Sequence, residues 1–474
     1  MIGARTNIFR DSRRPCGPFR PLGTSNRARG SVLIIVMWIC LGLVALTLYF
    51  ASSMSSELRA ADNRGAEVAS RQAIAGATRY ATYILKQYAV GGVVPEIDNY
   101  KAEAVPVGAA SFWFIGRATD SQQLQKQTNV QNEPYFALVD ESSKLNLNTA
   151  TAAMIQALPL PDMTPDFAAA VVAWRSANSA NAQTQDGILS QLNPPRHNKG
   201  APYETVDEIR LINEAALDLL VGEDTNRNGV LDPNEDDGEL SAPRDDQNGQ
   251  LLAGLLEYVT VYSSQPTTSA SGTRRTNVTT LTTPQARNTL SQLLVTRGIT
   301  QQRAQQMMAR ITNTTTLTSV ADFMVTTQVT AAEFALIHTD LTAAAAAAPG
   351  LINVNTASEA VLTCIPGIGA DGAATLVAYR AAHPEELTSM AWLTAAGLTA
   401  ANIRRAGTYI TDQSYQFSAD IAAVGATGRG YCREKVVFDV STGTPRIVNR
   451  QDLTAFGWAL GTTVKRTLNG TKDI

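Results

Sequence analysis

The twelve residues 224 to 235, DTNRNGVLDPNE, have the composition and spacing of a calcium-binding loop. Calcium prefers carboxylate, amide and carbonyl oxygens, and an EF-hand loop places them at positions 1, 3, 5, 7, 9 and 12 around a glycine at position 6. Gly229 stands at position 6, and the six ligand positions are filled by Asp224, Asn226, Asn228, Val230 (through its carbonyl), Asp232 and Glu235. The spacing predicts one bound calcium ion, and a solvated acidic turn is the alternative.

The surroundings of this loop add further expectations. We expect a helix that carries Ile209 and Leu220 to lead into it, Leu231 to reach the core and Arg227 to point outward. The exit is less regular, because Pro233 stands at position 10. A second candidate metal site, without template spacing, is formed by Asp245, Asp246 and Asn248. In an exported protein such an ion would be a structural staple, since extracellular modules bind calcium with Kd of about 10⁻⁴ to 10⁻³ M.

No catalytic arrangement is visible, and we expect no enzyme. The three histidines, at 197, 338 and 383, are far apart, and the chain has no HExxH, GxSxG or phosphate-binding glycine loop. The cysteines show no CxxC spacing that would indicate zinc or redox chemistry. Cys364 and Cys432 could form a disulfide in an oxidising compartment, and two buried thiols are the alternative.

The amino terminus indicates a single membrane span. The net charge of −3 for the chain and of +6 for residues 1 to 30 leaves −9 for the remainder, which argues against a polyanion as its main partner. Residues 31 to 56 carry no charge, and 32 to 51 are mostly apolar, which is long enough to cross a bilayer. The Arg-rich side stays in the cytoplasm by the positive-inside rule, so the bulk is exported. A secretory signal peptide is the rival interpretation, but its apolar core would be shorter.

The junction RGSVLII, residues 29 to 35, is typical of a pilin processing site after Gly30, with Ser31 as the new first residue. Ile35 stands at the fifth position, where pilin subunits usually carry glutamate. Helix formers continue beyond the span, and apolar residues from Ile74 to Tyr88 recur at three and four positions. We therefore expect one long helix from 31 to about 88.

The exported part contains a duplication. KLNLNTATAAMIQALP at 144 to 159 returns as LINVNTASEAVLTCIP at 351 to 366, with a constant offset of 207. Thr149 and Thr356 are the expected helix N-caps. A second helix, ending at Arg175 or Arg380, follows each copy, and IPGIG in the later copy is a helix-hairpin-helix pattern. DNA binding is disfavoured, because acidic residues stand where such hairpins need basic ones.

Strand-like segments flank these helical copies, at 110 to 118, 134 to 141 and from 415 onward. The predicted fold is therefore α+β, an α/β domain with a large, mainly helical insertion built from two repeated helix-hairpin-helix units. The expected parts are a leader (1–30), a transmembrane half-helix (31–56), a periplasmic helix with the first strands (57–141), a first helical lobe with the calcium loop (142–262), a linker (263–283), a second helical lobe (284–412) and the last strands (413–474).

Taken together, the processing junction, DESSKLNLNTA, AVVAWR, YETVDEI, GLLEYVTVYSS, INVNTAS and RIVNR resemble the K subunits of the type II (general) secretion system, a family of minor pseudopilins. The resemblance implies a pilin-like fold, cleavage after Gly30 by prepilin peptidase and methylation of Ser31. It also implies a place at the pseudopilus tip in the inner membrane, with the other minor pseudopilins and the secretion platform as partners, and a calcium-binding helical domain. INVNTAS followed by PGIG is also similar to membrane-anchored competence DNA receptors, the alternative function.

Overall fold

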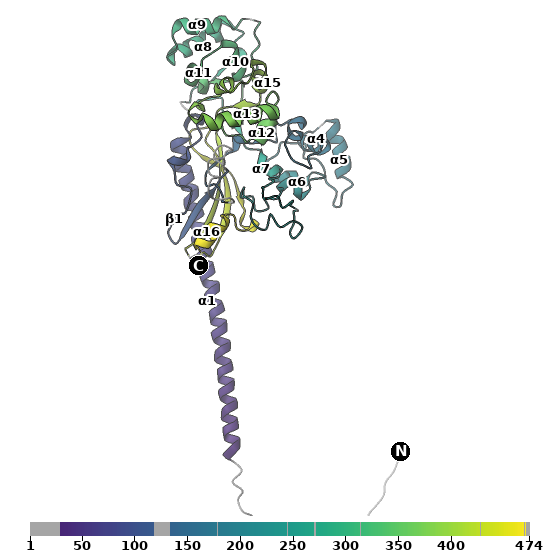
Figure 1. Cartoon of the computed structure of the whole chain (residues 1–474), viewed down its shortest axis with the longest axis vertical. Helices are drawn as coiled ribbons and strands as arrows, with labels where there is room; N and C mark the ends of the chain where they lie inside the picture. The colour runs from purple at the N-terminus through teal and green to yellow at the C-terminus, as the bar shows by residue number, and fades with distance from the viewer. Residues whose placement is uncertain are drawn as a thin grey trace, which may run out of the picture. The chain divides into compact units, whose positions relative to one another are not determined.

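The computed structural model describes residues 29–117, 133–177, 179–243, 245–269, 272–312, 314–426, 428–468 and 470. The chain forms two compact units, Met1–Asp62 and Asn63–Ile474. Helix α1 (Arg29–Tyr88) begins in the first unit and ends in the second, as expected from the sequence (Figure 1). Its apolar side chains between Val32 and Phe50 are at least half exposed. By length and composition this helix can cross a membrane. The leader residues 1–28 lie outside the described part.

The second unit is built on one antiparallel sheet, in the order β1-β2-β12-β13-β14. Strand β3 pairs with β12 next to β2. The strands come from two distant parts of the chain: β1 (Val105–Val107), β2 (Ala110–Ile115) and β3 (Val139–Asp140), then β12 (Gln416–Gly425), β13 (Cys432–Asp439) and β14 (Arg446–Asp452). The remaining elements near the sheet are η1 (Val90–Gly92), η2 (Ile97–Asn99), η3 (Glu141–Ser143), η8 (Thr454–Phe456) and α16 (Gly461–Leu468).

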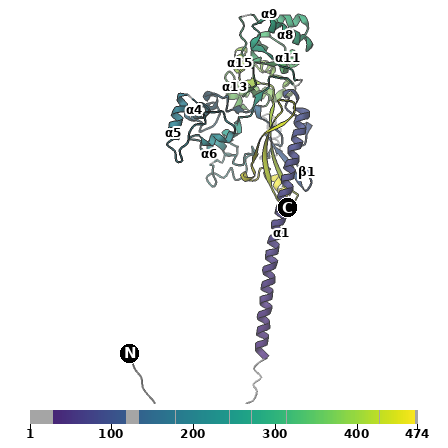
Figure 2. The ribbon, with the colours of Figure 1, turned by 180° about the vertical axis from the view of Figure 1, so that it is seen from behind.

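Strand β12 is the centre of this sheet, and all of its ten residues are buried. Side chains alternate between the two faces of a strand. The odd-numbered residues from Phe417 to Ala423 join the apolar cluster formed with the second half of α1, which lies along that face (Figure 2). The even-numbered residues include Gln416, Ser418 and Asp420, and they face the other way. The sheet is therefore covered on both sides, by α1 and by the insertion.

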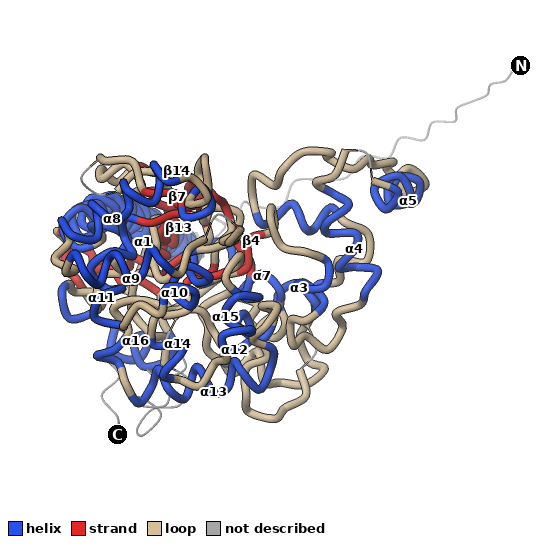
Figure 3. The backbone as a smooth tube through the Cα atoms, turned by 90° about the horizontal axis from the view of Figure 1, so that it is seen from above, coloured by secondary structure: helices blue, strands red, loops and turns tan. Residues whose placement is uncertain are grey.

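The insertion between β3 and β12 consists of three helical units rather than two (Figure 3). Each unit is opened and closed by a parallel pair of two-residue strands. We call them the first (145–260), middle (276–342) and last (352–411) helical unit. Their strand pairs are β4 (Leu145–Asn146) with β5 (Val259–Thr260), β7 (Thr276–Asn277) with β8 (Leu341–Thr342), and β10 (Ile352–Asn353) with β11 (Ile410–Thr411).

Short helices fill the space between these strands. The first unit holds α3 (Ala152–Gln156), α4 (Pro165–Trp174), α5 (Ala180–Leu189), η4 (Val206–Leu211), α6 (Leu217–Val221) and α7 (Leu255–Tyr258). The middle unit holds η5 (Val278–Thr280), α8 (Pro284–Thr296), α9 (Gln301–Ala309), α10 (Val320–Thr327), α11 (Ala331–Ile337) and η6 (His338–Asp340). The last unit holds α12 (Glu359–Thr363), α13 (Gly369–Ala382), η7 (Pro384–Glu386), α14 (Trp392–Ala395) and α15 (Ala400–Ala406).

The first and last units repeat the same polar contacts. Arg175 donates to the carbonyls of Leu147 and Ala150, and Arg380, 205 positions later, donates to the carbonyls of Val354 and Ala357, which follow the first pair by 207 positions. All three units share another contact at the closing strand. The threonine hydroxyl there accepts a hydrogen bond from the N–H two residues later, at 3.2 Å in each case, for Thr260, Thr342 and Thr411. The middle unit thus shares its framing strands and this contact with the other two, although its sequence does not show the repeat.

Two expectations differ from this arrangement. Residues 263–283 are not a bare linker, because they include β6 (Ser264–Gln265), which pairs with β9 (Ala348–Pro349), and the buried Arg275. One continuous apolar cluster extends from residue 145 to residue 410, so the two helical lobes share a core. The predicted N-caps are also displaced by two residues, since Thr151 and Ser358 cap α3 and α12.

Two adjacent carboxylates after β3 tie the sheet to the helical units. Asp140 accepts hydrogen bonds from the hydroxyls of Thr356 (2.6 Å) and Ser414 (2.5 Å), in and next to the last unit. Glu141 accepts from the hydroxyl of Thr260 (2.5 Å) and pairs with Lys435 of β13 (3.1 Å). Burial alone would raise the pKa of Glu141, but Lys435, Lys144 and the hydroxyl donors outweigh it and lower that pKa to about 2.

The lowered pKa of Glu141 predicts how the free energy of unfolding depends on pH in acid. Glu141 should stabilise the fold above its unfolded pKa, and this contribution should disappear as the pH falls towards about 2. Glu141→Gln should therefore lower the free energy of unfolding by roughly 3 kcal/mol at pH 7, and by only about 1 kcal/mol at pH 3. Urea unfolding at the two pH values measures both differences. Glu434→Gln removes a partly exposed carboxylate from β13 and is the matched control. Equal losses for Glu141→Gln at both pH values would contradict the assignment.

Candidate calcium loop

The predicted calcium loop follows α6, but the helix expected before it is interrupted. The chain forms η4, breaks at Glu214, whose φ is 65°, and resumes as α6. Gly229 has a φ of 79°, the left-handed conformation that position 6 of such a loop needs. Leu231 is buried, as expected. The loop is therefore entered from a helix of a little more than one turn.

Hydrogen bonds draw the acidic positions of the loop together. Asp224 accepts from the N–H groups of Asn228 and Gly229, both at 2.9 Å. Glu235, at the other end, accepts from the N–H of Thr225 (2.9 Å) and of Asp232 (3.1 Å).

The side chains at positions 3, 5 and 9 also meet. Asp232 accepts from the amide groups of Asn226 (2.6 Å) and Asn228 (2.9 Å). Val230 donates its N–H to Asn228 (2.9 Å). Together with the contacts of Asp224 and Glu235, these bonds close the twelve residues into one compact loop.

The loop has the features that a hard cation would compensate. Asp224, Asn226, Asn228, Asp232 and Glu235 are all at most 7% exposed. Burial raises the pKa of all three carboxyl groups, so their ionised forms lack sufficient compensation. The side-chain oxygen of Asn226 is buried without a hydrogen-bond donor. Carboxylate and amide oxygens suit Ca²⁺, which would supply the missing positive charge.

The loop offers a mixed set of oxygen ligands and not a cluster of acids. Within the described ranges, no group of three or more His, Cys, Asp or Glu side chains is arranged to hold a metal ion. Of the six ligand positions in this loop, three hold carboxylates and three hold the amides of Asn226 and Asn228 and the backbone carbonyl of Val230. Calcium binding therefore stays a prediction, supported by the burial and the unpaired oxygen.

The second candidate set, Asp245, Asp246 and Asn248, lies close to the end of the loop. Asp245 accepts from the N–H of Asp237 (2.8 Å) and of Gly238 (2.7 Å). Asp246 and Asn248 are exposed and bond to each other. These contacts account for a stable turn without an ion, so the second site remains a prediction with less support.

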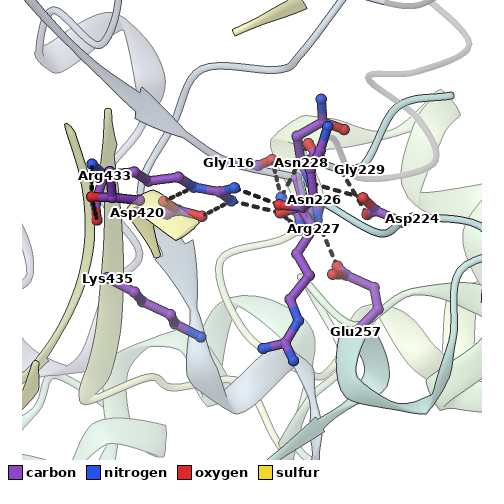
Figure 4. Close-up of polar contacts among 12 residues, drawn as sticks. Gly116, Asp224, Asn226, Arg227, Asn228, Gly229, Glu257, Asp420, Arg433 and Lys435 are labelled. Atoms are coloured by element: carbon purple, nitrogen blue, oxygen red, sulfur yellow. Dashed lines mark hydrogen bonds and ion pairs between the residues drawn. The ribbon is translucent and has the colours of Figure 1, made fainter. Parts of the chain in front are cut away.

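Two arginines that the sequence did not single out, Arg433 and Arg117, hold the backbone of the loop against the sheet. Arg433 of β13 donates to the carbonyls of Asn226 and of Arg227, the latter at 2.7 Å (Figure 4). Arg117, after β2, donates to the carbonyls of Arg227 (3.0 Å) and Asn228 (3.4 Å). Three consecutive carbonyls, at loop positions 3 to 5, are thereby fixed from outside.

Each of these arginines is itself held by a carboxylate. Arg433 is fully buried and makes two hydrogen bonds to Asp420 of β12, of 2.8 and 2.6 Å. Arg117 pairs with Glu257 of α7 at 2.8 Å. Paired in this way, the arginines are positioned donors rather than free counter-charges for the loop. Alternating polar residues in β12 and β13 were the signal in the sequence that could have indicated these contacts. In a strand considered alone, however, such alternation indicates a side that faces solvent.

Arg227 was expected to point outward, and this was wrong. Its side chain is 19% exposed, pairs with Asp207 at 3.3 Å and lies over the ring of Phe456, 4.8 Å from its centre. Its φ of 56° turns its carbonyl toward both clamping arginines. A positive φ at position 4 of the loop cannot be seen in residue types, since Arg rarely adopts it.

The other predicted site residues lie in separate places. Gly30 and Ser31 are within α1, but the surroundings of their side chains are outside the described part. Ile35 is 57% exposed. Cys364 and Cys432 are both buried, free thiols and do not form a disulfide.

The chain is similar to a solved structure. No model of a protein family matches the chain, and no curated protein matches it. Among solved structures, the complex of GspK, GspI and GspJ from the type 2 secretion system of enterotoxigenic Escherichia coli aligns over 81% of this chain and 96% of the matched chain. The sequence identity is 10% and the TM-score is 0.38. This is a weak likeness, and the function proposed below is based on the residues and contacts of this chain.

A calcium ion in the loop should raise the melting temperature. If Kd is about 10⁻⁴ M, 2 mM calcium stabilises the folded protein by roughly 2 kcal/mol over a chelator. Asp224→Ala should abolish this difference, whereas Asp246→Ala, in the second candidate set, should retain most of it. Calorimetric melts with calcium and with EGTA provide the measurement, and a wild-type protein that melts identically in both would rule out the site.

Arg433 and Arg117, which we call the arginine clamp, should raise the affinity of the loop for calcium without contacting the ion. Arg433→Met frees the carbonyls at positions 3 and 4, so the loop must be ordered when calcium binds, and we expect an affinity about tenfold lower, about 1.4 kcal/mol. Arg429→Met removes an exposed arginine before the same strand and serves as the control. Terbium luminescence titration reports the affinity directly. Unchanged affinity in a folded Arg433→Met protein would show that the clamp does not position the loop.

Proposed function

We propose that this chain is a minor pseudopilin of a type II secretion system, anchored in the inner membrane with its bulk in the periplasm. The observation that carries the proposal is helix α1. Its first part is apolar and exposed, and its second part packs on an antiparallel sheet. This layout, following the RGSVLII junction, is that of a subunit that is extracted from a membrane into a filament through one helix.

The position after the processing site supports a place at the tip. In a pilin filament the glutamate at position five is thought to pair with the terminal amine of a neighbouring subunit, which offsets the burial of both charges. A subunit at the tip lacks one neighbour, so its carboxylate would remain unpaired at a cost of about 2.5 kcal/mol or more. Ile35 avoids this cost, and the remaining bulk of the insertion fits a capping role. The subunit itself would perform no catalysis, and the loop calcium would be structural.

The partners follow from this role. Prepilin peptidase would cut after Gly30 and methylate Ser31, and the other minor pseudopilins and the inner-membrane platform would assemble with the mature chain. Mass spectrometry of the chain purified from its native cell should find a methylated Ser31 at the amino terminus. Gly30→Val should leave the leader in place and stop secretion. An intact leader on the wild-type protein would refute the proposal.

Position five gives a sharper prediction. Ile35→Glu should reduce co-purification with the other minor pseudopilins at least severalfold, because its carboxylate lacks a partner in an apolar setting. Ile34→Glu introduces the same charge at the adjacent position and controls for membrane insertion. If both variants insert and assemble like the wild type, position five has no bearing on the tip.

A DNA receptor is the competing function, because of the hairpin pattern of the last helical unit. The full chain in detergent should not retard DNA in gel shifts at low salt. Retention that weakens with added salt would instead favour the receptor.

A further inference from the structure

A cavity of about 250 Å³ lies between the sheet and the first helical unit. One side is formed by residues of the central strands, such as Ser418 and Lys435, and the other by residues of the first unit, such as Val206 and Leu256. The calcium loop contributes Asp224 and Arg227. The cavity is much larger than a single water needs, and its wall combines apolar and charged side chains.

Lys144 lines this cavity and is the charged group there without a partner of its own. Only 9% of the residue is exposed. Its ammonium group forms no hydrogen bond or ion pair with any residue in the described part of the chain. Asp224 accepts hydrogen bonds from the N–H groups of Asn228 and Gly229, and the other charged residues of the wall are in ion pairs. These pairs are Arg117 with Glu257, Arg227 with Asp207, Lys435 with Glu141, Arg450 with Glu434, and Arg433 with Asp420.

Lys144 has no anion of its own among the charges that surround it. The groups that act most strongly on Lys144 are Glu257, Lys435, Glu141 and Arg117, which form two neutral pairs. Lys144 adds an uncompensated charge to a buried cluster, which is unfavourable in a medium of low dielectric constant. Burial accordingly lowers the pKa of Lys144. A carboxylate placed in the cavity would give the Lys144 ammonium group an anionic partner.

The chemistry of the walls restricts what can bring that charge. Much of the wall is apolar, and the Lys144 ammonium group is available to a charged ligand. The apolar side chains include Ile115, Val139, Val437 and Leu453. An aliphatic stem would displace water from these walls, and a carboxylate at its end would meet Lys144. We propose that the cavity binds a carboxylate on a short aliphatic stem, either a small free acid or the glutamate side chain of another protein, with Lys144 as its charge partner.

Equilibrium dialysis of the full chain in detergent tests this proposal, with radiolabelled pentanoate as the probe. The wild type should bind one equivalent of pentanoate saturably, and Lys144→Met should bind it with at least tenfold lower affinity. The pentanoate retained with Lys144→Met also measures uptake by the detergent micelles, which is subtracted. Lys101→Met removes an exposed lysine and should bind like the wild type. Lys144→Arg keeps the charge and should retain binding, which guards against a loss caused by misfolding alone.

Competitors then separate the sources. Displacement by N-acetylglutamate α-amide as well as by unlabelled pentanoate would indicate a peptide ligand, and displacement by pentanoate alone would indicate a free acid. Pentanol, which has the stem without the charge, should not compete. The proposal is overturned if the wild type binds neither acid saturably, or if Lys144→Met binds them as the wild type does. The outcome does not depend on the secretion role, which concerns α1.

Discussion

The buried polar face of strand β12 is the constraint around which the second unit is arranged. A central antiparallel strand usually has one face in water, but all ten residues of β12 are buried. Gln416, Ser418 and Asp420 must therefore find partners in the protein. Gln416 accepts from the N–H of Ser264 at 2.7 Å, the hydroxyl of Ser418 helps to lower the pKa of Glu141, and Asp420 binds Arg433. The insertion is attached to the sheet by hydrogen bonds, among them those from Ser264 to Gln416 and from Arg433 to the loop carbonyls, and their polar groups would lose these partners if the insertion moved away.

The same polar face connects the sheet to the candidate cation site. Asp420 fixes Arg433, and Arg433 fixes the carbonyls at loop positions 3 and 4. Arg433 and Arg117 already hold the backbone carbonyls of Asn226 and Asn228. A bound ion would in addition order the side chains of these two residues. Binding and attachment are then linked in both directions, because whatever stabilises the loop in this conformation also stabilises its contact with β13. No contact between the ion and the sheet is required.

The sequence predicted those features that depend on local pattern. The long helix, the alternating strands, the ligand order of the calcium loop and the two similar helical copies all follow from residue types at short spacing. The middle helical unit was missed because its opening strand, Thr276–Asn277, has only one of the two asparagines found in LNLN and INVN. The sequences of its helices also differ from those of the other two units. Arg117 and Arg433 were missed because their partners are more than 100 positions away in sequence. Burial of alternate polar residues in β12 could not be inferred either, since only tertiary structure covers that face.

The position of the insertion has a consequence for the order of folding. Its two ends leave the sheet at neighbouring strands, where Asp140 is paired with Phe417. Forming that pair from an unfolded chain closes a loop of roughly 280 residues, an entropic cost of about 5 kcal/mol. Helical units, with their many local contacts, form quickly and bring the two ends side by side. The central strand can then be added between its neighbours at little further cost, so the sheet should be the last part of this protein to be completed.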